Sequence, residues 1–126
     1  MKKYLVVASI FGALAIILGA FGAHTLKNTL SESSLASFET GVRYQMYHAI
    51  VLLFVNSYSK FSLKQLNRIN VALSIGVFLF SGSIFAIAFG IPAKFIWFVT
   101  PLGGLLLILG WVFMLHFLPN QSHYVA

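Results

Sequence analysis

Histidine, glutamine and hydroxyl side chains are the groups best suited to chemistry in this largely apolar chain. Gln45 and His48 lie in the stretch GVRYQMYHAI, just before the apolar run VLLFV, and His24 follows the first long apolar stretch. An imidazole can exchange a proton near neutral pH, and a primary amide both donates and accepts hydrogen bonds. The hydroxyl groups that could join them are those of Ser81, Ser83 and Thr100. Such a set could bind a small molecule or handle a proton.

Catalysis by these groups lacks its usual partners. The chain contains no aspartate, and its two acidic side chains, Glu32 and Glu39, are expected outside the apolar core. A Ser-His-Asp triad is therefore impossible, and a Ser-His-Glu version would need Glu39 to reach inward. Neither HxxxH nor HExxH occurs, so we predict no metal site. We expect neither an enzyme nor a bound cofactor.

The composition indicates the environment that must hold these residues. Of the 126 residues, 60% are hydrophobic and 8% are charged, and the mean hydropathy is +0.93. A soluble domain is roughly 25% charged, and a soluble fold of this length would expose much of its leucine, isoleucine and phenylalanine to water. We therefore predict an integral membrane protein. The net charge of +6 is explained by topology determinants and anionic lipid headgroups, so no nucleic-acid partner is expected.

Long apolar runs determine the predicted architecture. A helix needs about 20 largely apolar residues to cross a hydrocarbon core of about 30 Å. The sequence predicts one all-α transmembrane domain over residues 1–126, folded as a four-helix bundle. The predicted helices cover about residues 4–24, 38–59, 69–90 and 95–118. The first stretch also has the pattern of a signal peptide, but we expect it to be retained as a helix.

The last predicted helix contains a break or cap near Thr100 and Pro101. One interpretation is a short interfacial segment followed by a helix with Thr100 as N-cap and Pro101 at its first position. The other is one longer helix that is kinked at Pro101. We favour the first interpretation.

Basic residues beside the predicted helices indicate the orientation in the membrane. Loops on the cytoplasmic side carry an excess of lysine and arginine. The basic residues expected on one side are Lys2, Lys3, Lys60, Lys64 and Arg68. Those expected on the other are Lys27, Arg43 and Lys94. We therefore predict that both termini lie in the cytoplasm, in a multi-pass protein of the bacterial cytoplasmic membrane.

With this topology, most membrane-embedded polar residues gather in the outer half of the bilayer. Polar side chains in lipid normally face the interior of a bundle. The candidate polar binding site consists of His24, Gln45, His48, Ser81, Ser83 and Thr100. Alternatively, these residues only form hydrogen bonds between helices, at about 1 kcal/mol each. Glu39 and Arg43 are predicted to form an i, i+4 ion pair at the outer interface.

Small residues recur at helical spacing and predict close packing of helices. In lipid the hydrophobic effect does not draw helices together, so close backbone approach at small residues contributes more. The candidate packing residues are Gly12, Gly19, Gly22, Gly82, Gly90, Gly103, Gly104 and Gly110. We expect them to face neighbouring helices of one bundle. A pore lining or a self-pairing outer surface are the alternatives.

Several motifs carry a resemblance to a known family. GAFGAHTLK at 19–27, TGVRYQMYHA at 40–49, FSGSIF at 80–85, and TPLGG with GW at 100–104 and 110–111 resemble the family called domain of unknown function 423. These are small four-helix membrane proteins of bacteria, with relatives in eukaryotes. The resemblance implies the fold, the topology and the membrane location, and no activity, substrate or cofactor. Family members often have FSGSLY where this chain has Ile84 and Phe85, so no tyrosine hydroxyl is available there.

Two classes of function are consistent with these observations. The first is a structural or regulatory membrane protein that binds membrane lipids, a second copy of itself or another membrane protein. The second is a small transporter or channel for an ion, a proton or a small molecule, acting as an oligomer. A pore would need a continuous polar face, whereas the inner half is nearly all apolar. This pattern favours the first class.

Overall fold

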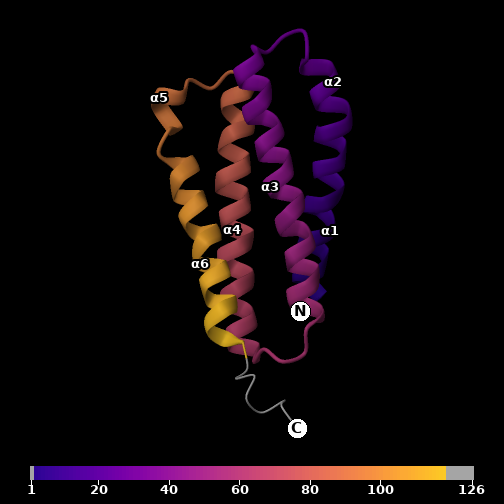
Figure 1. Cartoon of the computed structure of the whole chain (residues 1–126), viewed down its shortest axis with the longest axis vertical. Coiled ribbons are helices and arrows are strands. Elements are labelled where there is room, and N and C mark those ends of the chain that lie inside the picture. Colours follow the sequence, from indigo (N-terminus) through magenta and orange to yellow (C-terminus); the bar gives the residue numbers. More distant parts are fainter. Residues whose placement is uncertain (1, 119–126) are drawn as a thin grey trace.

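Helices make up the part of the chain that the structure describes. The structure is a computed structural model, and it describes residues 2–118, the side chain of Ala23 excepted, with no strand among them. The elements are α1 (Lys2–Ile17), the π-helical η1 (Leu18–Gly22), α2 (Ala23–Leu26), α3 (Glu32–Ser57), α4 (Leu63–Ala88), α5 (Ala93–Ile96) and α6 (Val99–Phe117) (Figure 1). The predicted all-α class is confirmed.

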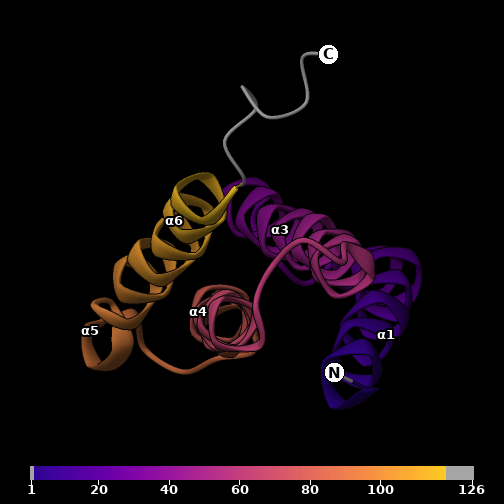
Figure 2. The ribbon, with the colours of Figure 1, turned by 90° about the horizontal axis from the view of Figure 1, so that it is seen from below.

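The long helices α1, α3, α4 and α6 lie side by side. Helix α3 packs against both α1 and α4, and α6 packs against α4 (Figure 2). The bundle has two ends, the α2/α5 end and the N-terminal end. The α2/α5 end contains α2, α5 and the turn before α3, and the N-terminal end contains Lys2, the turn between α3 and α4, and the last turn of α6 (Figure 1).

Serine side chains cap the two longest helices. At the start of α3, Oγ of Ser31 accepts a hydrogen bond of 3.1 Å from the backbone N–H of Ser34. At the start of α4, Ser62 and Gln65 form a capping box with hydrogen bonds of 3.2 and 3.0 Å. Such caps satisfy backbone N–H groups that lack a partner within the helix. They explain why both helices begin before the predicted positions 38 and 69.

The start of α6 differs from the prediction. The helix begins at Val99, its N-cap residue Phe98 makes no side-chain cap hydrogen bond, and Thr100 lies within the first turn. The predicted N-cap at Thr100 is therefore wrong. A break before the last helix is present, but it lies at residues 97–98, between α5 and α6. Pro101 fits the first turn of α6 because backbone N–H groups there have no partner inside the helix.

A π-helical turn follows α1, and the sequence analysis did not predict it. A Cβ at Gly19 would lie 3.1 Å from Cγ1 of Val42, and a Cβ at Gly22 would lie 3.0 Å from Cζ of Phe38. The glycines therefore let α3 approach this wide turn closely. As a result, the side chain of Phe38 is fully buried.

Three helical stretches are long and apolar enough to cross a membrane. They are Lys2–Leu26, Leu63–Ala88 and Val99–Phe117. Helix α3 is as long as α4, at 26 residues, but its polar and charged side chains make it less apolar. By length and composition these three stretches agree with the prediction of membrane-spanning helices, whereas a fourth crossing stays a prediction.

The hydrophobic core lies toward the N-terminal end, where α3, α4 and α6 meet. Leu52 and Val55 on α3 and Ile69 and Leu73 on α4 are fully buried, and Leu107 on α6 is nearly so. The outward faces of the long helices carry exposed large apolar side chains instead. This distribution suits a surface in contact with lipid, where exposed apolar groups cost nothing.

The interface between α4 and α6 is built on glycines. A Cβ at Gly103 would lie 2.3 Å from the backbone N of Phe80, and a Cβ at Gly110 would lie 2.4 Å from Cδ2 of Leu73. On α4, Gly76 also lies close to α6, because a Cβ at Gly76 would lie 3.0 Å from the backbone N of Leu107. The prediction that Gly103 and Gly110 face a neighbouring helix agrees with these contacts. Gly76 was not among the predicted packing residues.

The other predicted packing glycines fall into two groups. Gly12 approaches α3, with 3.8 Å from an added Cβ to Cβ of Ala49, and Gly104 makes ordinary contact with a ring on α4 at 3.7 Å. Gly82 and Gly90, in contrast, face open space, because among residues 2–118 an added Cβ would meet no atom within 4 Å apart from the neighbouring backbone. The expectation that they pack against a helix is therefore wrong. Gly90 has a φ of 117° and ends α4 in a conformation that favours glycine.

Candidate functional site

The predicted polar residues do not converge on one point. Five of the six form side-chain hydrogen bonds to a neighbouring helix. These bonds connect four different pairs of helices, and they lie at different positions along the bundle. Those five are Gln45, His48, Ser81, Ser83 and Thr100. The sixth, His24, is exposed on α2, and no hydrogen bond from its side chain is found among the described residues. His24 is therefore not held in the contacts that connect the other five predicted site residues.

Gln45 connects α3 to α1. Its Nε2 donates a hydrogen bond of 2.8 Å to the backbone O of Phe11. The side chain is 5% exposed, and it borders a cavity of about 170 Å³ between α1, α3 and α4. A buried amide that donates to a carbonyl of the adjacent helix aligns the two helices along their length.

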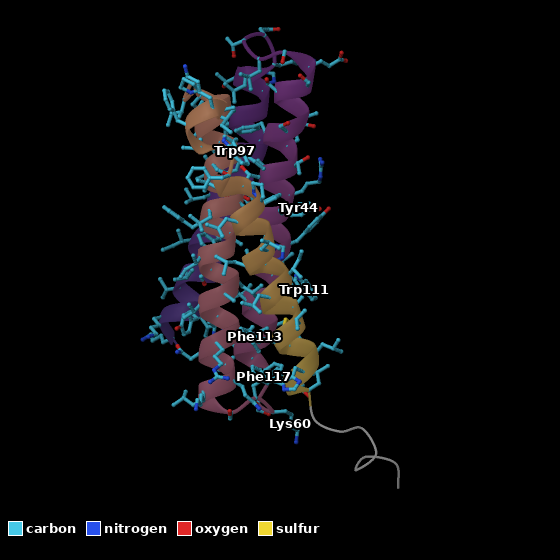
Figure 3. All side chains as sticks on the ribbon, turned by 90° about the vertical axis from the view of Figure 1, so that its left-hand side faces the viewer. Tyr44, Lys60, Trp97, Trp111, Phe113 and Phe117 are labelled. Atoms are coloured by element: carbon cyan, nitrogen blue, oxygen red, sulfur yellow. The ribbon has the colours of Figure 1, made fainter. Side chains whose placement is uncertain are left out.

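His48 connects α3 to α6. Nε1 of Trp111 donates a hydrogen bond of 3.0 Å to Nε2 of His48, so Nε2 carries no proton. Nδ1 then carries the proton and donates to the backbone O of Tyr44 at 2.7 Å. The imidazole is thus neutral, with both nitrogens occupied. Figure 3 shows Trp111 on α6, and this residue is partly exposed while His48 is buried.

Two serines connect α4 to its neighbours. Oγ of Ser81 donates a hydrogen bond of 2.7 Å to the backbone O of Gly41 on α3. Oγ of Ser83 lies 3.0 Å from the backbone O of Phe80 and 2.5 Å from Oγ1 of Thr100 on α6. Because the Ser83 hydroxyl donates its only proton to Phe80, the Thr100 hydroxyl donates to Ser83. Thr100 is therefore used for contact between helices, not for capping.

Glu39 and Arg43 do not form the predicted ion pair. Both side chains are exposed at the α2/α5 end. Nη2 of Arg43 donates a hydrogen bond of 3.1 Å to Oγ1 of Thr40, and no ion pair joins Arg43 to Glu39 in the described part of the chain. Exposed charges gain little from pairing, and holding two long side chains in one geometry costs entropy.

Comparison with known proteins identifies the family. A family described as "Protein of unknown function (DUF423)" matches residues 18–104. The chain belongs to the DUF423 family. It is 36% identical over 118 residues to a UPF0382 membrane protein of Haemophilus influenzae, with 88% of this chain and 89% of that protein covered. No solved structure matches the chain.

Relatives in two other bacteria agree with this assignment to the DUF423 family. The chain is 38% identical to the UPF0382 inner membrane protein YgdD of Escherichia coli, covering 88% of this chain and 85% of the relative. It is 35% identical to the UPF0382 membrane protein YwdK of Bacillus subtilis, and the match covers 89% of this chain and 92% of the relative. The predicted family and the predicted membrane association are thus confirmed. The region matched to the DUF423 family includes all six predicted polar residues.

Two further polar contacts were missed by sequence reasoning. Asn56 and Asn70 exchange a pair of hydrogen bonds between α3 and α4, at 2.7 and 2.9 Å, and Asn70 is fully buried. The hydroxyl of Tyr4 on α1 donates to Oδ1 of Asn67 on α4 at 2.6 Å. A signal for the first pair existed. Asn56 lies near the end of the predicted helix 38–59 and Asn70 near the start of the predicted helix 69–90, so both are expected at the same end of the bundle. The second has no such signal, because position 67 falls in the loop between the predicted helices 38–59 and 69–90.

This arrangement leaves few polar groups available for chemistry. Among the buried side-chain oxygen and nitrogen atoms of residues 2–118, Oγ of Ser74 is the one without a hydrogen-bond partner. No group of three histidine or acidic side chains in that region is close enough to hold a metal ion. Apart from His24, the predicted polar residues thus connect neighbouring helices of this DUF423 member.

Proposed function

We propose that this DUF423 member is a structural or regulatory membrane component that acts by binding lipid or another membrane protein, without catalysis or transport of its own. The supporting observation is that Gln45, His48, Ser81 and Ser83 are each held by a partner on an adjacent helix. A polar group bound in this way is unavailable to a substrate unless the bundle is first opened. The cavities beside these groups are lined mostly by apolar side chains.

We further propose that α3 is a fourth membrane crossing and that both termini lie in the cytoplasm. At 1.5 Å per residue the 26 residues of α3 extend about 39 Å, which exceeds a hydrocarbon core of about 30 Å. The N-terminal end carries five basic side chains against three at the other end, which favours a cytoplasmic location for it. Trp97, 65% exposed at the α2/α5 end, and Lys60 at the N-terminal end suit the two interfaces (Figure 3).

The topology is testable with single cysteines, because the chain contains none. Thr29→Cys lies in the turn before α3 and Ser59→Cys in the turn before α4, and both positions are exposed. We expect a membrane-impermeant maleimide to label Thr29→Cys in intact spheroplasts. Ser59→Cys should be labelled only after permeabilisation. Equal labelling of both positions in intact spheroplasts would exclude a fourth crossing by α3.

A flux assay tests the absence of transport. In proteoliposomes we expect the flux of protons, potassium, sodium and small metabolites to equal that of protein-free liposomes. A flux that Gln45→Leu abolishes and His24→Ala preserves would establish the small transporter or channel instead. The matched control is suitable because His24 is exposed and outside the bundle contacts, whereas Gln45 is buried in them.

A further inference from the structure

An open groove runs between α1 and α4. These two helices point in the same direction, and α3 packs against both of them (Figure 2). Three cavities lie along the groove, and the first shares no lining residue with the second. The first, at the N-terminal end, has about 580 Å³ and is lined by Lys3, Tyr4, Leu63, Lys64 and Asn67. The second has about 340 Å³ and is lined by Val7, Ile10, Phe11, Ser74, Ile75 and Phe78. The third, of about 170 Å³, shares Phe11 and Phe78 with the second.

The polarity of the groove changes along its length. Lys3 and Lys64 flank the N-terminal cavity from the two helices. Between them, the hydrogen bond from Tyr4 to Oδ1 of Asn67 leaves Nδ2 of Asn67 as a donor with no partner among the described residues. Beyond this point the lining is apolar except for Ser74 in the second cavity and Gln45 in the third. The groove thus combines cationic and amide donors at one end with a narrow apolar channel.

The chain itself offers no acidic side chain to the two lysines. Its only carboxylate side chains are those of Glu32 and Glu39. Both belong to the first turns of α3, at the α2/α5 end, whereas Lys3 and Lys64 lie at the opposite end. The anion that complements this cavity must therefore come from outside the chain's own side chains.

The length of the groove suits an acyl chain. From Asn67 to Phe78 it spans 11 steps along α4, about 16 Å at 1.5 Å per residue. This matches one leaflet, since the hydrocarbon core is about 30 Å thick. An anionic lipid also brings its headgroup charge to the two lysines at the N-terminal end, which the apolar face of a second helix does not.

We propose that this groove binds one anionic phospholipid of the leaflet at the N-terminal end. The phosphate lies between Lys3 and Lys64 and accepts from Nδ2 of Asn67, and one acyl chain occupies the channel beside Ser74 and Phe78. Basic cavities between membrane helices are suited to lipid headgroups, and each lysine near the surface strengthens the attraction. The inference rests on the proposed function, because it names the lipid class and the place where it binds.

The test compares two double variants of the full-length protein in detergent. Delipidated protein is titrated with phosphatidylglycerol or phosphatidylcholine, and bound lipid is counted by native mass spectrometry. We expect one tightly bound phosphatidylglycerol, and an affinity about tenfold or more weaker in Lys3→Gln/Lys64→Gln. Lys2→Gln/Arg68→Gln is the matched control, since it removes two exposed charges from the same end that do not line the N-terminal cavity. The control should bind as the parent does.

A third variant tests the apolar channel. Ser74→Leu places a bulkier apolar side chain at the wall of the middle cavity, and it breaks no hydrogen bond because Oγ of Ser74 has no partner among residues 2–118. We expect it to lose the bound phosphatidylglycerol while its helical circular dichroism and elution volume stay unchanged. An unchanged affinity in either the lysine or the serine variant would overturn the proposal, as would an equal loss in the control. None of these results depends on the flux assay, so failure here leaves the non-transport role standing.

Discussion

Helix α4 has two unlike flanks. On the α6 side, Gly103 and Gly110 bring the two backbones so close that a methyl group would overlap atoms of α4. On the α1 side, Gly82 has no atom within 4 Å of an added Cβ, and a groove follows the helix. Glycines of α6 thus allow tight packing on the α6 flank of α4, which we call the closed flank. The α1 flank, which we call the open flank, faces the groove.

This difference shows what a glycine in a membrane helix can and cannot indicate. Close packing needs a large residue or a backbone segment opposite the glycine, as Phe80 and Leu73 are opposite Gly103 and Gly110. The partner of Gly82 would have to come from α1, which α3 holds at a distance. Spacing along one helix therefore predicts an interface only when the facing helix is also known.

The largest expected effect is that of Gly103→Ala on the closed flank. The new Cβ would lie 2.3 Å from the backbone N of Phe80 and 2.8 Å from its Cα, so the helices must separate. We expect a loss of at least about 3 kcal/mol in stability, because backbone cannot rotate away as a side chain can. Thermal unfolding in detergent measures this, and an unchanged melting temperature would contradict the closed interface.

A smaller effect is expected from Thr100→Val on the same flank. The substitution keeps the shape and removes the hydroxyl that bonds to Ser83. Ser83 keeps its bond to the backbone O of Phe80, so we expect a cost of about 1 kcal/mol or less. Thr25→Val, exposed on α2, is the matched control and should leave the melting temperature unchanged. An equal shift of the melting temperature in both variants would show that the effect comes from replacing threonine by valine, not from losing the hydrogen bond to Ser83.

Tyr4→Phe on the open flank should cost less again. It removes the hydrogen bond to Asn67 and leaves the ring in place. We expect about 0.5 kcal/mol, because Asn67 is exposed and can bond to water or a headgroup instead. Denaturant titration in mixed micelles measures the change. A cost above that of Thr100→Val would show that the α1 flank is held more firmly than its groove implies.

The smallest effect is expected from Gly82→Ala. Open space around the position accepts a methyl group, and alanine favours a helix over glycine. We expect a change within about 0.5 kcal/mol or a slight gain in stability. The same thermal scan compares it directly with Gly103→Ala. A large loss here would mean that α1 and α4 approach more closely than the described contacts indicate.

The class, the membrane setting and most of the helical regions could be predicted from the sequence. Apolar runs of about 20 residues carry that information without any knowledge of packing. Helix boundaries were less predictable, because Ser31 and Ser62 act through caps outside the apolar pattern. The π turn at Leu18–Gly22 depends on contact with Phe38 and Val42 of another helix. No local pattern could reveal that contact.

The polar residues were predictable as a set, but not their partners. Gln45 and His48 were expected inside the bundle, and both are buried there. The expected common site assumed that residues at similar depth meet. Ser83 and Thr100 do meet, whereas Gln45, His48 and Ser81 each face a different neighbour. Trp111 was missed as the partner of His48 because a tryptophan in an apolar run gives no signal of its own. Asn70 was missed although it pairs with Asn56, 14 residues away.

The asparagine pair has a consequence for the order in which the chain is made. Asn56 leaves the ribosome 14 residues ahead of Asn70, roughly one to three seconds at common rates of synthesis. During that interval the amide of Asn56 has no partner on α4. Helix α3 therefore completes its contacts only when α4 emerges, so the two helices of this hairpin reach their final state together.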